Sequence, residues 1–599
     1  MLKTDPTQSS PIPPLKRLAA LRRELARQGA DGFVVPRADC HQNEYVPPSE
    51  ERLAWLTGFT GSAGLAVVFA RSAALFVDGR YTVQAREQSD SSVDCLDLGA
   101  QKDWLAAQLK PGMKLALDPW LHTPGEVARF EAAAAAAKAE IVLVAEDPIA
   151  AVWRDRPDAP AAPITLHPAR LAGETAAKKL KRIAQTITGE AALVSDPHAI
   201  AWALNIRGGD VAHTPIPLAF LLARAQGKPT LYIDPRKVDE ATRDALDELV
   251  TLAAFDALQT DLAAAAARKA QVRFDQKTAP AALVRAFEAA GGTAEVAADP
   301  ITLMKAVKNA AELKGAHAAQ LRDGAALVRF LAWFDAHAET GFITESAAAD
   351  KLEAFRRETG RLRDLSFPTI SAAGAHAALP HYRVTTASDC VIERGLFLLD
   401  SGAQYEDGTT DITRTIGVGP PSREMRDRYT RVLKGHIAIA RAIFPVGATG
   451  AQIDGFARRA LWEAGLDYDH GTGHGIGSYL SVHEGPQSIS KLSQVALQPG
   501  MILSNEPGYY KPGHYGIRLE NLVLVEPREI PGGERPMLGF ETISFAPFDV
   551  RLIDQRLLDP LEARWIDLYH RRVRAELTPL IAPAEKRWLA HVTRALARW

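Results

Sequence analysis

The sequence predicts a multidomain α/β protein in which two related domains precede a third region that carries the chemistry. At 599 residues the chain is too long for one core, since domains average roughly 150 residues. Short apolar runs alternate with amphipathic helical patterns through its first half, which indicates α/β domains. One such pattern occurs twice in the same order, and a proline-rich segment separates the two copies.

The first domain is expected over residues 1–160. Its first helix is predicted to begin at Pro14, after which leucines recur at helical spacing with basic residues between them. The proline-rich segment 154–163 can continue neither a helix nor a central strand, so it marks a linker and a boundary near residue 160. Short apolar runs predict buried strands at 31–36, 64–70 and 73–78.

The second domain, residues 161–302, partly repeats the first. AIAWALNIRGGDV parallels the earlier ERLAWLTGFTGSA, and PTLYIDPRKV parallels AALFVDGRYT. The copies differ in loop length but keep their order, which indicates two related α/β domains in tandem. A third region is expected over 303–540, with a C-terminal extension over 541–599. It opens with a long helical pattern from Ile301 to Phe334. The motifs whose residue types suggest catalysis or metal binding follow that pattern.

Composition and charge argue against several classes of partner. Apolar residues make up 47% of the chain and charged residues 24%, and 70 Lys+Arg balance 72 Asp+Glu, so neither nucleic acid nor an anionic membrane is expected to bind. The three cysteines form no CxxC pair, which disfavours a disulfide framework or a cysteine zinc site. Since neither a signal peptide nor a run of about 20 apolar residues is evident, a cytoplasmic protein is expected.

The motif DSGAQYEDGTTDITRT, residues 400–415, contains the first two candidate site residues. An apolar run before Asp400 predicts a strand, EDG at 406–408 predicts a turn, and alternating polar residues predict a second strand. Such a hairpin brings Asp400 and Asp411 onto one face, where two ionised carboxylates require a proton or a cation between them. Taken alone, the segment favours a simpler reading, in which Asp400 caps a strand end and Asp411 faces solvent.

Glycines and histidines crowd the segment 469–486, DHGTGHGIGSYLSVHEGP. Glycines at alternate positions let the backbone run close to another group, so His474 can project into a crowded site. A phosphate-binding loop is disfavoured, because Ile476 and Ser478 stand where a third glycine would be needed.

Two glutamates complete the set of candidate ligands. Glu506 ends an apolar run in MILSNEPGYY, and Glu520 lies within the strand pattern of YGIRLENLVLV, where burial is costly unless the carboxylate is paired or binds a metal. Arg518 offers the simpler alternative of an ion pair on the same strand face.

Four carboxylates and one imidazole therefore form one candidate metal centre. These donors suit manganese, magnesium or similar divalent ions better than a thiolate zinc site, and the number of carboxylates points to two ions. No HExxH segment occurs, so the single-zinc metalloprotease layout is absent from the sequence. The five residues are Asp400, Asp411, His474, Glu506 and Glu520.

These motifs, together with LPHY, NEPGYY and GIRLEN in the same order, resemble the two-metal pita-bread peptidases, and among them the Xaa-Pro aminopeptidases (aminopeptidase P). HQNEYVPP, LTGFTGSAG and DGRY resemble the N-terminal domain of the long, three-domain cytosolic form, and FETISFAPFDVRLID resembles the start of its C-terminal extension. The resemblance implies two tandem creatinase-like α/β domains, an α+β pita-bread catalytic domain and a homodimer.

Carried over position by position, the resemblance implies that Asp411 and Glu520 bridge two ions and that Asp400 completes one of them. His474 and Glu506 would complete the other ion, with Glu506 also acting as proton shuttle. Manganese is the most expected metal, while zinc, cobalt and iron stay open. The remaining implied site residues are the active-site histidines His381, His470 and His483 and, in supporting roles, Arg518 and Tyr510.

The implied reaction removes the N-terminal residue that precedes proline, through attack of a metal-bridging hydroxide on the scissile carbonyl. The substrates would be peptides with proline at the second position. A prolidase, which shares the fold and metals but cleaves only dipeptides, is the alternative. A metal-free binding protein on the same fold is less expected, because all five ligand positions are present.

One departure from the family pattern lies beside His381. The segment commonly reads GxNGAxxHY, whereas this chain has GAHAALPHY over residues 374–382. His376 is therefore expected to be a polar surface residue, and Pro380 to reshape the loop that carries His381. The effect of the departure on substrate preference stays open.

Overall fold

The computed structural model describes residues 13–596, and its internal contacts divide the chain into two compact units. The first unit extends to residue 302, except for residues 170–173, which belong with the second unit from residue 303 onward. Both tandem domains lie in the first unit, while the third region and the C-terminal extension lie in the second. The finer boundaries at 160 and 540 stay predictions, and residues 1–12 and 597–599 lie outside the described residues.

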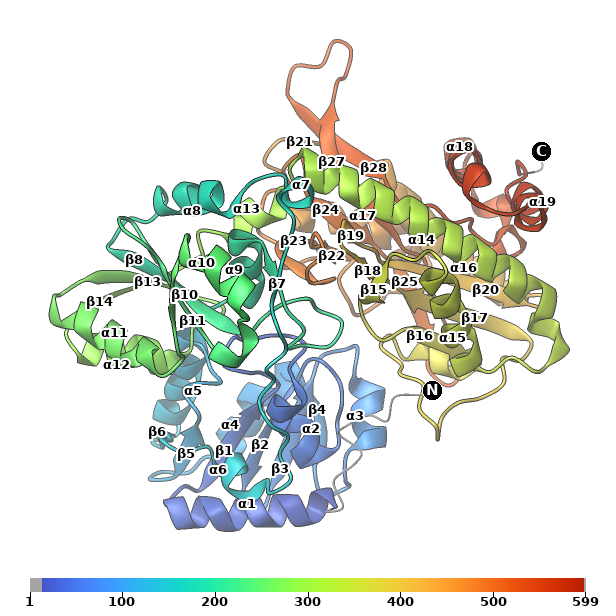
Figure 1. Ribbon diagram of the computed structural model, residues 1–599. Coiled ribbons are helices and arrows are strands. Elements are labelled where there is room, and N and C mark those ends of the chain that lie inside the picture. Colours follow the sequence, from blue (N-terminus) through green and yellow to red (C-terminus); the bar gives the residue numbers. More distant parts are fainter. Residues whose placement is uncertain (1–12, 597–599) are drawn as a thin grey trace. The chain divides into compact units, whose positions relative to one another are not determined.

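The first domain is built on a six-stranded sheet in the order β4-β3-β2-β1-β5-β6 (Figure 1). The predicted helix from Pro14 and the three predicted strands are confirmed, and residues 154–163 form neither helix nor strand. The strands are β1 (Gly32–Pro36), β2 (Leu65–Phe69), β3 (Ala73–Val77), β4 (Asp94–Asp97), β5 (Lys114–Leu117) and β6 (Glu140–Leu143). The helices are α1 (Pro14–Gln28), α2 (Arg52–Thr57), α3 (Thr82–Gln88), α4 (Gln101–Gln108), α5 (Pro124–Ala136) and α6 (Pro148–Val152).

Both faces of this sheet are buried. Phe33 and Val35 of β1 belong to one apolar cluster, whereas Val34 between them belongs to another. Side chains alternate across a strand, so a strand with a core on each side is apolar along its whole length. This is why the predicted strands read as continuous apolar runs rather than as alternating ones.

The second domain has the same sheet topology, in the order β12-β11-β10-β8-β13-β14. In the first domain β1 pairs antiparallel with β2 and parallel with β5. In the second domain β8 pairs in the same way, antiparallel with β10 and parallel with β13, so the predicted repeat is confirmed. The strands are β8 (Ala191–Val194), β10 (Ala219–Arg224), β11 (Thr230–Ile233), β12 (Thr251–Ala253), β13 (Gln271–Asp275) and β14 (Thr293–Ala297), beside the short pair β7 (Thr165–Leu166) and β9 (Ile206–Arg207). The helices are α8 (Ala176–Ala184), α9 (Pro197–Leu204), α10 (Glu240–Asp247), α11 (Ala257–Ala267) and α12 (Ala281–Ala289).

The second unit combines antiparallel sheets with helices, as an α+β fold requires. Its largest sheet has the order β21-β28-β27-β24-β22-β23, and its strands are β21 (Ile443–Pro445), β22 (Gly473–Gly475), β23 (Glu484–Ile489), β24 (Ile502–Asn505), β27 (Asn521–Arg528) and β28 (Met537–Thr542). The smaller sheets contain β15 (Leu362–Leu365), β16 (Ile370–Ala373), β17 (Gly395–Ser401), β18 (Ala403–Tyr405), β19 (Gly408–Thr409), β20 (Ile412–Val418), β25 (Gly508–Lys511) and β26 (Tyr515–Arg518). The helices are α7 (Ala169–Ala172), α13 (Thr302–Ala306), α14 (Ala310–His337), α15 (Glu345–Arg357), α16 (Arg423–Ala440), α17 (Gly450–Trp462), α18 (Pro560–Leu577) and α19 (Pro583–Val592).

The long helix predicted from Ile301 to Phe334 is interrupted, which corrects that expectation. It consists of α13 and α14 with a break between them, where Val307 forms a bridge to Met501. Asn309 caps α14, since its side chain accepts from the backbone N–H of Glu312 while the Glu312 carboxylate accepts from the Asn309 N–H. This capping box satisfies backbone donors that a continuous helix would have satisfied internally. The apolar spacing of the sequence continues across the break, and therefore the break was not predicted.

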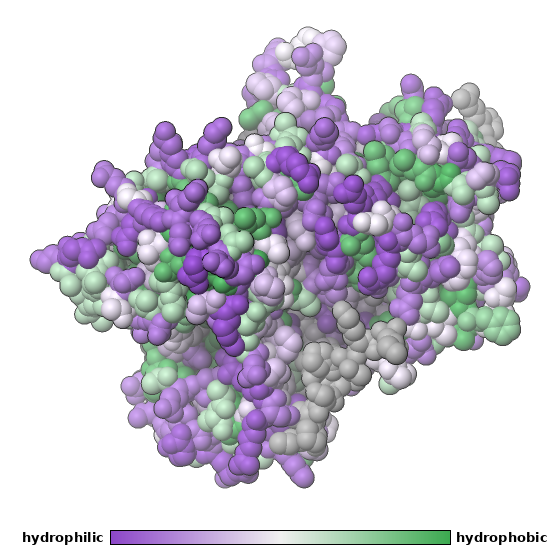
Figure 2. Space-filling model, in the orientation of Figure 1, coloured by the Kyte–Doolittle hydropathy of each residue, from purple (hydrophilic) through white to green (hydrophobic). Residues whose placement is uncertain are grey.

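On the face drawn in Figure 2, hydrophilic residues predominate and hydrophobic ones occur in small groups among them. Within residues 13–596, no helix combines the length and apolar character that a bilayer crossing requires.

Candidate metal centre

Strands β17 and β20 place the two aspartates. Asp400 is paired with Thr413 across the ladder, and Asp411 directly precedes β20. The turn between β18 and β19 falls at Glu406 and Asp407, where the EDG motif predicted it. Asp400 is 7% exposed and Asp411 3%, and the charge of Asp411 acts on Asp400. The predicted hairpin is therefore confirmed, and the simpler reading of a solvent-facing Asp411 is wrong.

The other three candidate ligands converge on the same place. Glu506 follows the last residue of β24, Glu520 separates β26 from β27, and His474 is the middle residue of β22. The His474 Nε2 atom lies 3.5 Å from Asp411 Oδ2 and 3.4 Å from Glu506 Oε1. Asp411, His474 and Glu520 each offer a ligand atom, and these atoms lie within 4.8 Å of one another.

Two glycines allow β22 to lie between its neighbours. A Cβ atom added to Gly473 would lie 1.9 Å from the carbonyl oxygen of Ser504, and one added to Gly475 would lie 2.3 Å from that of Glu484. No side chain fits at either position, so the alternating glycines are required for close backbone approach, as predicted. His474, between them, is thereby brought up to the carboxylates.

Three oxygens in this cluster are buried and accept no hydrogen bond from any described residue. They are Asp400 Oδ1, Asp411 Oδ1 and Glu520 Oε1. A buried acceptor without a donor is costly, and the cost rises when the group carries charge. Oxygens of this kind are the preferred ligands of hard divalent ions, so the residues present fit a two-ion centre.

Electrostatics in the cluster point the same way. Desolvation raises the pKa values of Asp400, Glu506 and Glu520, and for Glu520 the neighbouring carboxylates raise it further. Desolvation alone would lower the pKa of His474, but Asp411 and Glu506 raise it to about 9. These shifts show that burial and mutual repulsion disfavour several ionised carboxylates side by side, and a bound cation would relieve that repulsion.

Arg518 pairs with Asp400 rather than with Glu520. Its Nη2 atom donates to Asp400 Oδ2 at 2.6 Å, and its Nη1 atom donates to the Tyr510 hydroxyl at 2.7 Å. The Tyr510 hydroxyl lies 2.8 Å from His470 Nε2. The ion pair with Glu520 considered from the sequence is therefore wrong, and a polar chain runs from Asp400 through Arg518 and Tyr510 to His470.

The remaining histidines lie beside this chain and the metal cluster. Arg518 Nη2 also donates to the carbonyl oxygen of Pro380 at 3.1 Å, which holds the residue before His381 against the site. The His483 ring meets the His474 ring edge-on, with centroids 4.4 Å apart.

Several residues that hold these histidines carry no sequence signal that identifies them. Lys305 and Lys308 form buried ion pairs with Glu484, next to His483, and the Lys305 Nζ atom lies 3.0 Å from Glu484 Oε2. Arg458 donates to the carbonyl oxygen of His470 at 2.8 Å. The two lysines are distant in sequence from Glu484, and Arg458 contacts His470 only through the His470 backbone. No local sequence pattern therefore identifies these residues.

His376 is not the polar surface residue that the sequence led us to expect. Its side chain is 30% exposed, and its Nδ1 atom lies 2.9 Å from Glu345 Oε1. The ring stacks on Tyr382, with centroids 4.4 Å apart and planes at 18°. Glu345, at the start of α15, was not singled out from the sequence, because a glutamate in the first turn of a helix is common.

Comparison with known families matches all parts of this architecture. The profile described as metallopeptidase family M24 matches residues 314–527, and that of the C-terminal region of peptidase M24 matches 536–596. Profiles of the creatinase/prolidase N-terminal domain match residues 17–150 and 155–312. Two N-terminal modules thus precede the region that contains the metal centre.

Relatives match over nearly the whole chain. Aminopeptidase P2 of Arabidopsis thaliana is 38% identical over 97% of this chain and 89% of its own length. A probable Xaa-Pro aminopeptidase P of Fusarium vanettenii is 38% identical over 93% of this chain and 94% of its own length. The crystal structure of an X-prolyl aminopeptidase from Caenorhabditis elegans, described as a cytosolic enzyme with a di-nuclear active site, superposes with a TM-score of 0.92 at 32% identity, covering 98% of this chain and all of that one.

Proposed function

Because the chain belongs to the aminopeptidase P family of M24 metallopeptidases, we propose that it hydrolyses the N-terminal Xaa-Pro bond of peptides with two divalent ions as cofactors. The observation that carries the proposal is the set of buried carboxylate oxygens without donors around His474. A scaffold protein on the same fold would have no need to bury such oxygens together.

The proposed role of each ligand is the one that the family resemblance implies, and the convergence of these side chains supports it. Asp411 and Glu520 would contact both ions, Asp400 one of them, and His474 and Glu506 the other. When bound, the two ions lower the pKa of a water molecule and polarise the scissile carbonyl. We propose manganese as the ion, since oxygen donors outnumber the single imidazole, with zinc, cobalt or iron as outcomes of metal analysis.

The chain's own residues supply orientation and proton transfer. Glu506 is the proposed proton shuttle, because its Oε1 atom is fixed by a 3.1 Å hydrogen bond from Ser504 Oγ and faces His474. Arg518 favours the ionised form of Asp400 and holds its carboxylate in place, while Tyr510 orients His470 through its hydroxyl. His381, His470 and His483 are the proposed groups that hold the substrate and stabilise charge on the carbonyl oxygen.

The substrate bond accounts for this specialised arrangement. The nitrogen of an Xaa-Pro bond carries no hydrogen, and the proline ring restricts the residue before it. As in any amide hydrolysis, the leaving nitrogen must gain a proton as the bond breaks, which is the role proposed for Glu506.

Hydrolysis assays on defined peptides test the proposal. The purified chain is stripped with a chelator and assayed on Arg-Pro-Pro and on the dipeptide Arg-Pro, without metal and with added Mn²⁺, Zn²⁺, Co²⁺ or Fe²⁺ in turn. Metal-restored cleavage of the tripeptide supports the proposal. Cleavage of the dipeptide alone would reassign the chain to the prolidases, and no cleavage with any of the four metals would overturn the catalytic proposal.

We also propose a cytoplasmic location and a homodimer. The location is supported by the cytosolic description of the nematode enzyme and by the three cysteines, which are all free. Cell fractionation tests the location, and light scattering on the purified protein tests the dimer, with a monomeric mass as the contrary result.

A further inference from the structure

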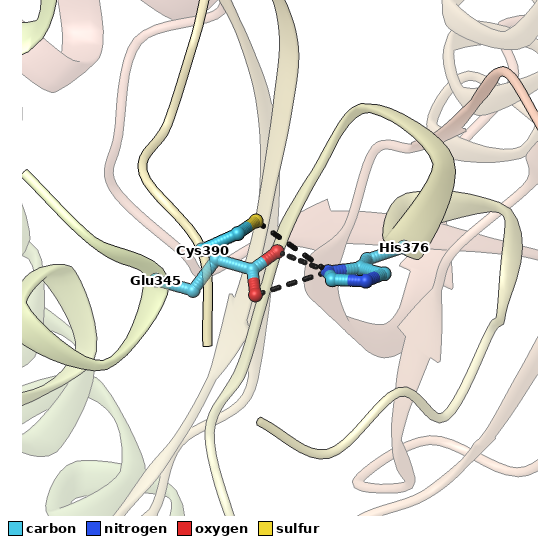
Figure 3. Close-up of side chains that lie close together, drawn as sticks. All are labelled: Glu345, His376 and Cys390. Carbon is cyan, nitrogen blue, oxygen red and sulfur yellow. Dashed lines mark hydrogen bonds and ion pairs between the residues drawn. The ribbon is translucent and has the colours of Figure 1, made fainter. Parts of the chain in front are cut away.

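A second cluster of metal-binding side chains lies in the same unit, formed by Glu345, His376 and Cys390 (Figure 3). Glu345 begins α15, His376 lies in the 3-10 turn Gly374–Ala378, and Cys390 lies in the loop before β17. His376 Nδ1 is 2.9 Å and 3.1 Å from the two Glu345 oxygens and 3.7 Å from Cys390 Sγ. Figure 3 shows the carboxylate and the sulfur approaching the imidazole from one side. We propose that this mixed cluster binds one Zn²⁺ ion, at a site separate from the carboxylate centre.

The donor types favour zinc over the ions proposed for the carboxylate centre. One thiolate, one imidazole and one carboxylate are ligands that zinc combines, whereas manganese and magnesium prefer oxygen. Tetrahedral zinc with Zn–N of about 2.0–2.1 Å and Zn–S of about 2.3 Å separates the nitrogen and sulfur ligands by about 3.6 Å. The observed 3.7 Å between His376 Nδ1 and Cys390 Sγ matches this separation. The nitrogen–oxygen distances are hydrogen-bonded ones, which open by a few tenths of an ångström when an ion replaces the proton.

The charge at Glu345 supports a cation. Its side chain is fully buried, and it accepts hydrogen bonds from the backbone N–H of Ala373 at 2.7 Å, from the Tyr382 hydroxyl at 2.8 Å and from His376. None of these is a permanent positive charge. Elsewhere in this unit, buried Asp323 is paired with Arg356 and buried Glu484 with two lysines. A divalent ion would compensate Glu345 as those cations compensate their carboxylates.

Binding releases the thiol proton and changes the tautomer of His376. The proton that Nδ1 now donates to Glu345 is lost to solvent and Nε2 takes one up, so that Nδ1 can bind the ion. Burial raises the pKa of the Cys390 thiol, and the charge of Glu345 adds to this, to about 11. The thiol is therefore protonated at neutral pH, and the ion takes the place of its proton, which leaves to solvent as the sulfur–metal bond forms. His376 is 30% exposed and Cys390 is partly exposed, so an ion can enter and a water molecule can complete the coordination.

The position of the site gives it a consequence for the peptidase. Tyr382, which donates to Glu345, directly follows His381, one of the histidines proposed to contact substrate. An ion bound by Glu345, His376 and Cys390 ties α15, the turn before His381 and the loop after it to one point. We expect occupancy to stabilise this segment against local opening.

Cobalt substitution tests the proposal directly. Thiolate ligation to Co²⁺ gives a charge-transfer absorption in the near ultraviolet, and the proposed carboxylate centre contains no sulfur ligand. The full-length chain, stripped and titrated with Co²⁺, should develop this band with a stoichiometry of one. The band should persist in Cys95→Ser, a control that removes another partly buried cysteine, and disappear in Cys390→Ser and His376→Gln.

Zinc content and a second variant complete the test. After equilibration with Zn²⁺ and removal of free ion, Cys390→Ser should hold one zinc fewer than the unmodified chain. Asp411→Asn should lose peptidase activity yet keep the cobalt band, which separates failure of this site from failure of the proposed function. Absence of the band in the unmodified chain at saturating Co²⁺ would overturn the proposal without relying on the folding of any variant, and would leave the cluster as a hydrogen-bonded brace.

Discussion

The second unit contains two clusters of potential metal ligands that differ in how their carboxylates are satisfied. At the carboxylate centre, Asp400, Asp411 and Glu520 each bury an oxygen that no described residue donates to. At the mixed cluster, both oxygens of Glu345 accept hydrogen bonds from protein groups. The first arrangement is costly without an ion, whereas the second is satisfied with or without one.

This difference predicts that the two clusters depend on ions in different ways. A cluster with unsatisfied buried oxygens requires its cations for both stability and chemistry. A cluster whose oxygens are already hydrogen-bonded can accept an ion in exchange for the thiol proton. Loss of that ion should affect local order more than the reaction. Four measurements test this contrast, and the first concerns the substitution that should reduce activity most.

Loss of one charge at the carboxylate centre should nearly abolish activity. Asp411→Asn keeps the size of the side chain but removes the charge shared by the two proposed ions. A loss of about 4 kcal/mol of transition-state stabilisation corresponds to about 10³-fold in kcat/KM on an Xaa-Pro tripeptide. The matched control is Asp407→Asn in the same segment, whose carboxylate pairs with Arg322 and is not among the candidate ligands, so its loss should affect stability rather than the reaction. Activity of Asp411→Asn within tenfold of the unmodified chain would contradict the ligand assignment.

Chelation should destabilise the chain chiefly through the carboxylate centre. Ions present at a hundredfold excess over their Kd stabilise the folded state by about 3 kcal/mol per independent site. Thermal unfolding with and without chelator should therefore show a lower midpoint for the stripped protein, restored by Mn²⁺. The same comparison on Cys390→Ser should retain most of the shift, and on Asp411→Asn should lose most of it. The reverse ranking would show that the mixed cluster is the more ion-dependent one.

Arg518→Lys should lower the peptidase activity by about 10–100-fold, as expected for a residue that orients a metal ligand. Lysine keeps the charge but cannot reach Asp400, Tyr510 and the Pro380 carbonyl with a planar fork. Steady-state kinetics should show a fall in kcat and weaker metal retention, with Arg528→Lys at the far end of β27 as control. An effect confined to KM would indicate a role in substrate binding alone.

Tyr382→Phe should have the smallest effect. It removes the hydroxyl that bonds Glu345 at 2.8 Å and Ser388 Oγ at 2.9 Å. Glu345 keeps its hydrogen bonds from Ala373 and His376, so the expected cost is about 1 kcal/mol of unfolding free energy. Activity should stay within a few-fold of the unmodified chain. Tyr515→Phe, which removes a comparable bond to the exposed side chain of Glu424, is the control. A loss of activity as large as that of Arg518→Lys would place Tyr382 in the reaction itself.

Local pattern accounts for what could be predicted of the site. Residues Thr413 and Thr415 alternate on one face of β20, and their hydroxyls donate to Glu520 Oε2 at 2.7 Å and to the Arg518 carbonyl at 3.0 Å. The turn, the strand alternation and the need for glycine at 473 and 475 are all short-range properties, so they can be read from neighbouring residues. The tandem α/β domains were visible for the same reason.

Partner choice could not be predicted, because it depends on strand register and packing. Glu520 is two residues from Arg518 in sequence, yet Arg518 bonds Asp400, which another strand brings closer. The break between α13 and α14 was hidden by continuous apolar spacing, since the capping box at Asn309 satisfies the backbone there.

Residue type and local periodicity were enough to predict the types of ligand, the hairpin that carries the two aspartates and the repeated domain order. The folded chain was needed to show which buried oxygens lack donors, and that Glu345, His376 and Cys390 meet at one point. Those facts depend on three separate elements packing together, and side-chain convergence over such distances leaves no trace in the spacing of the chain.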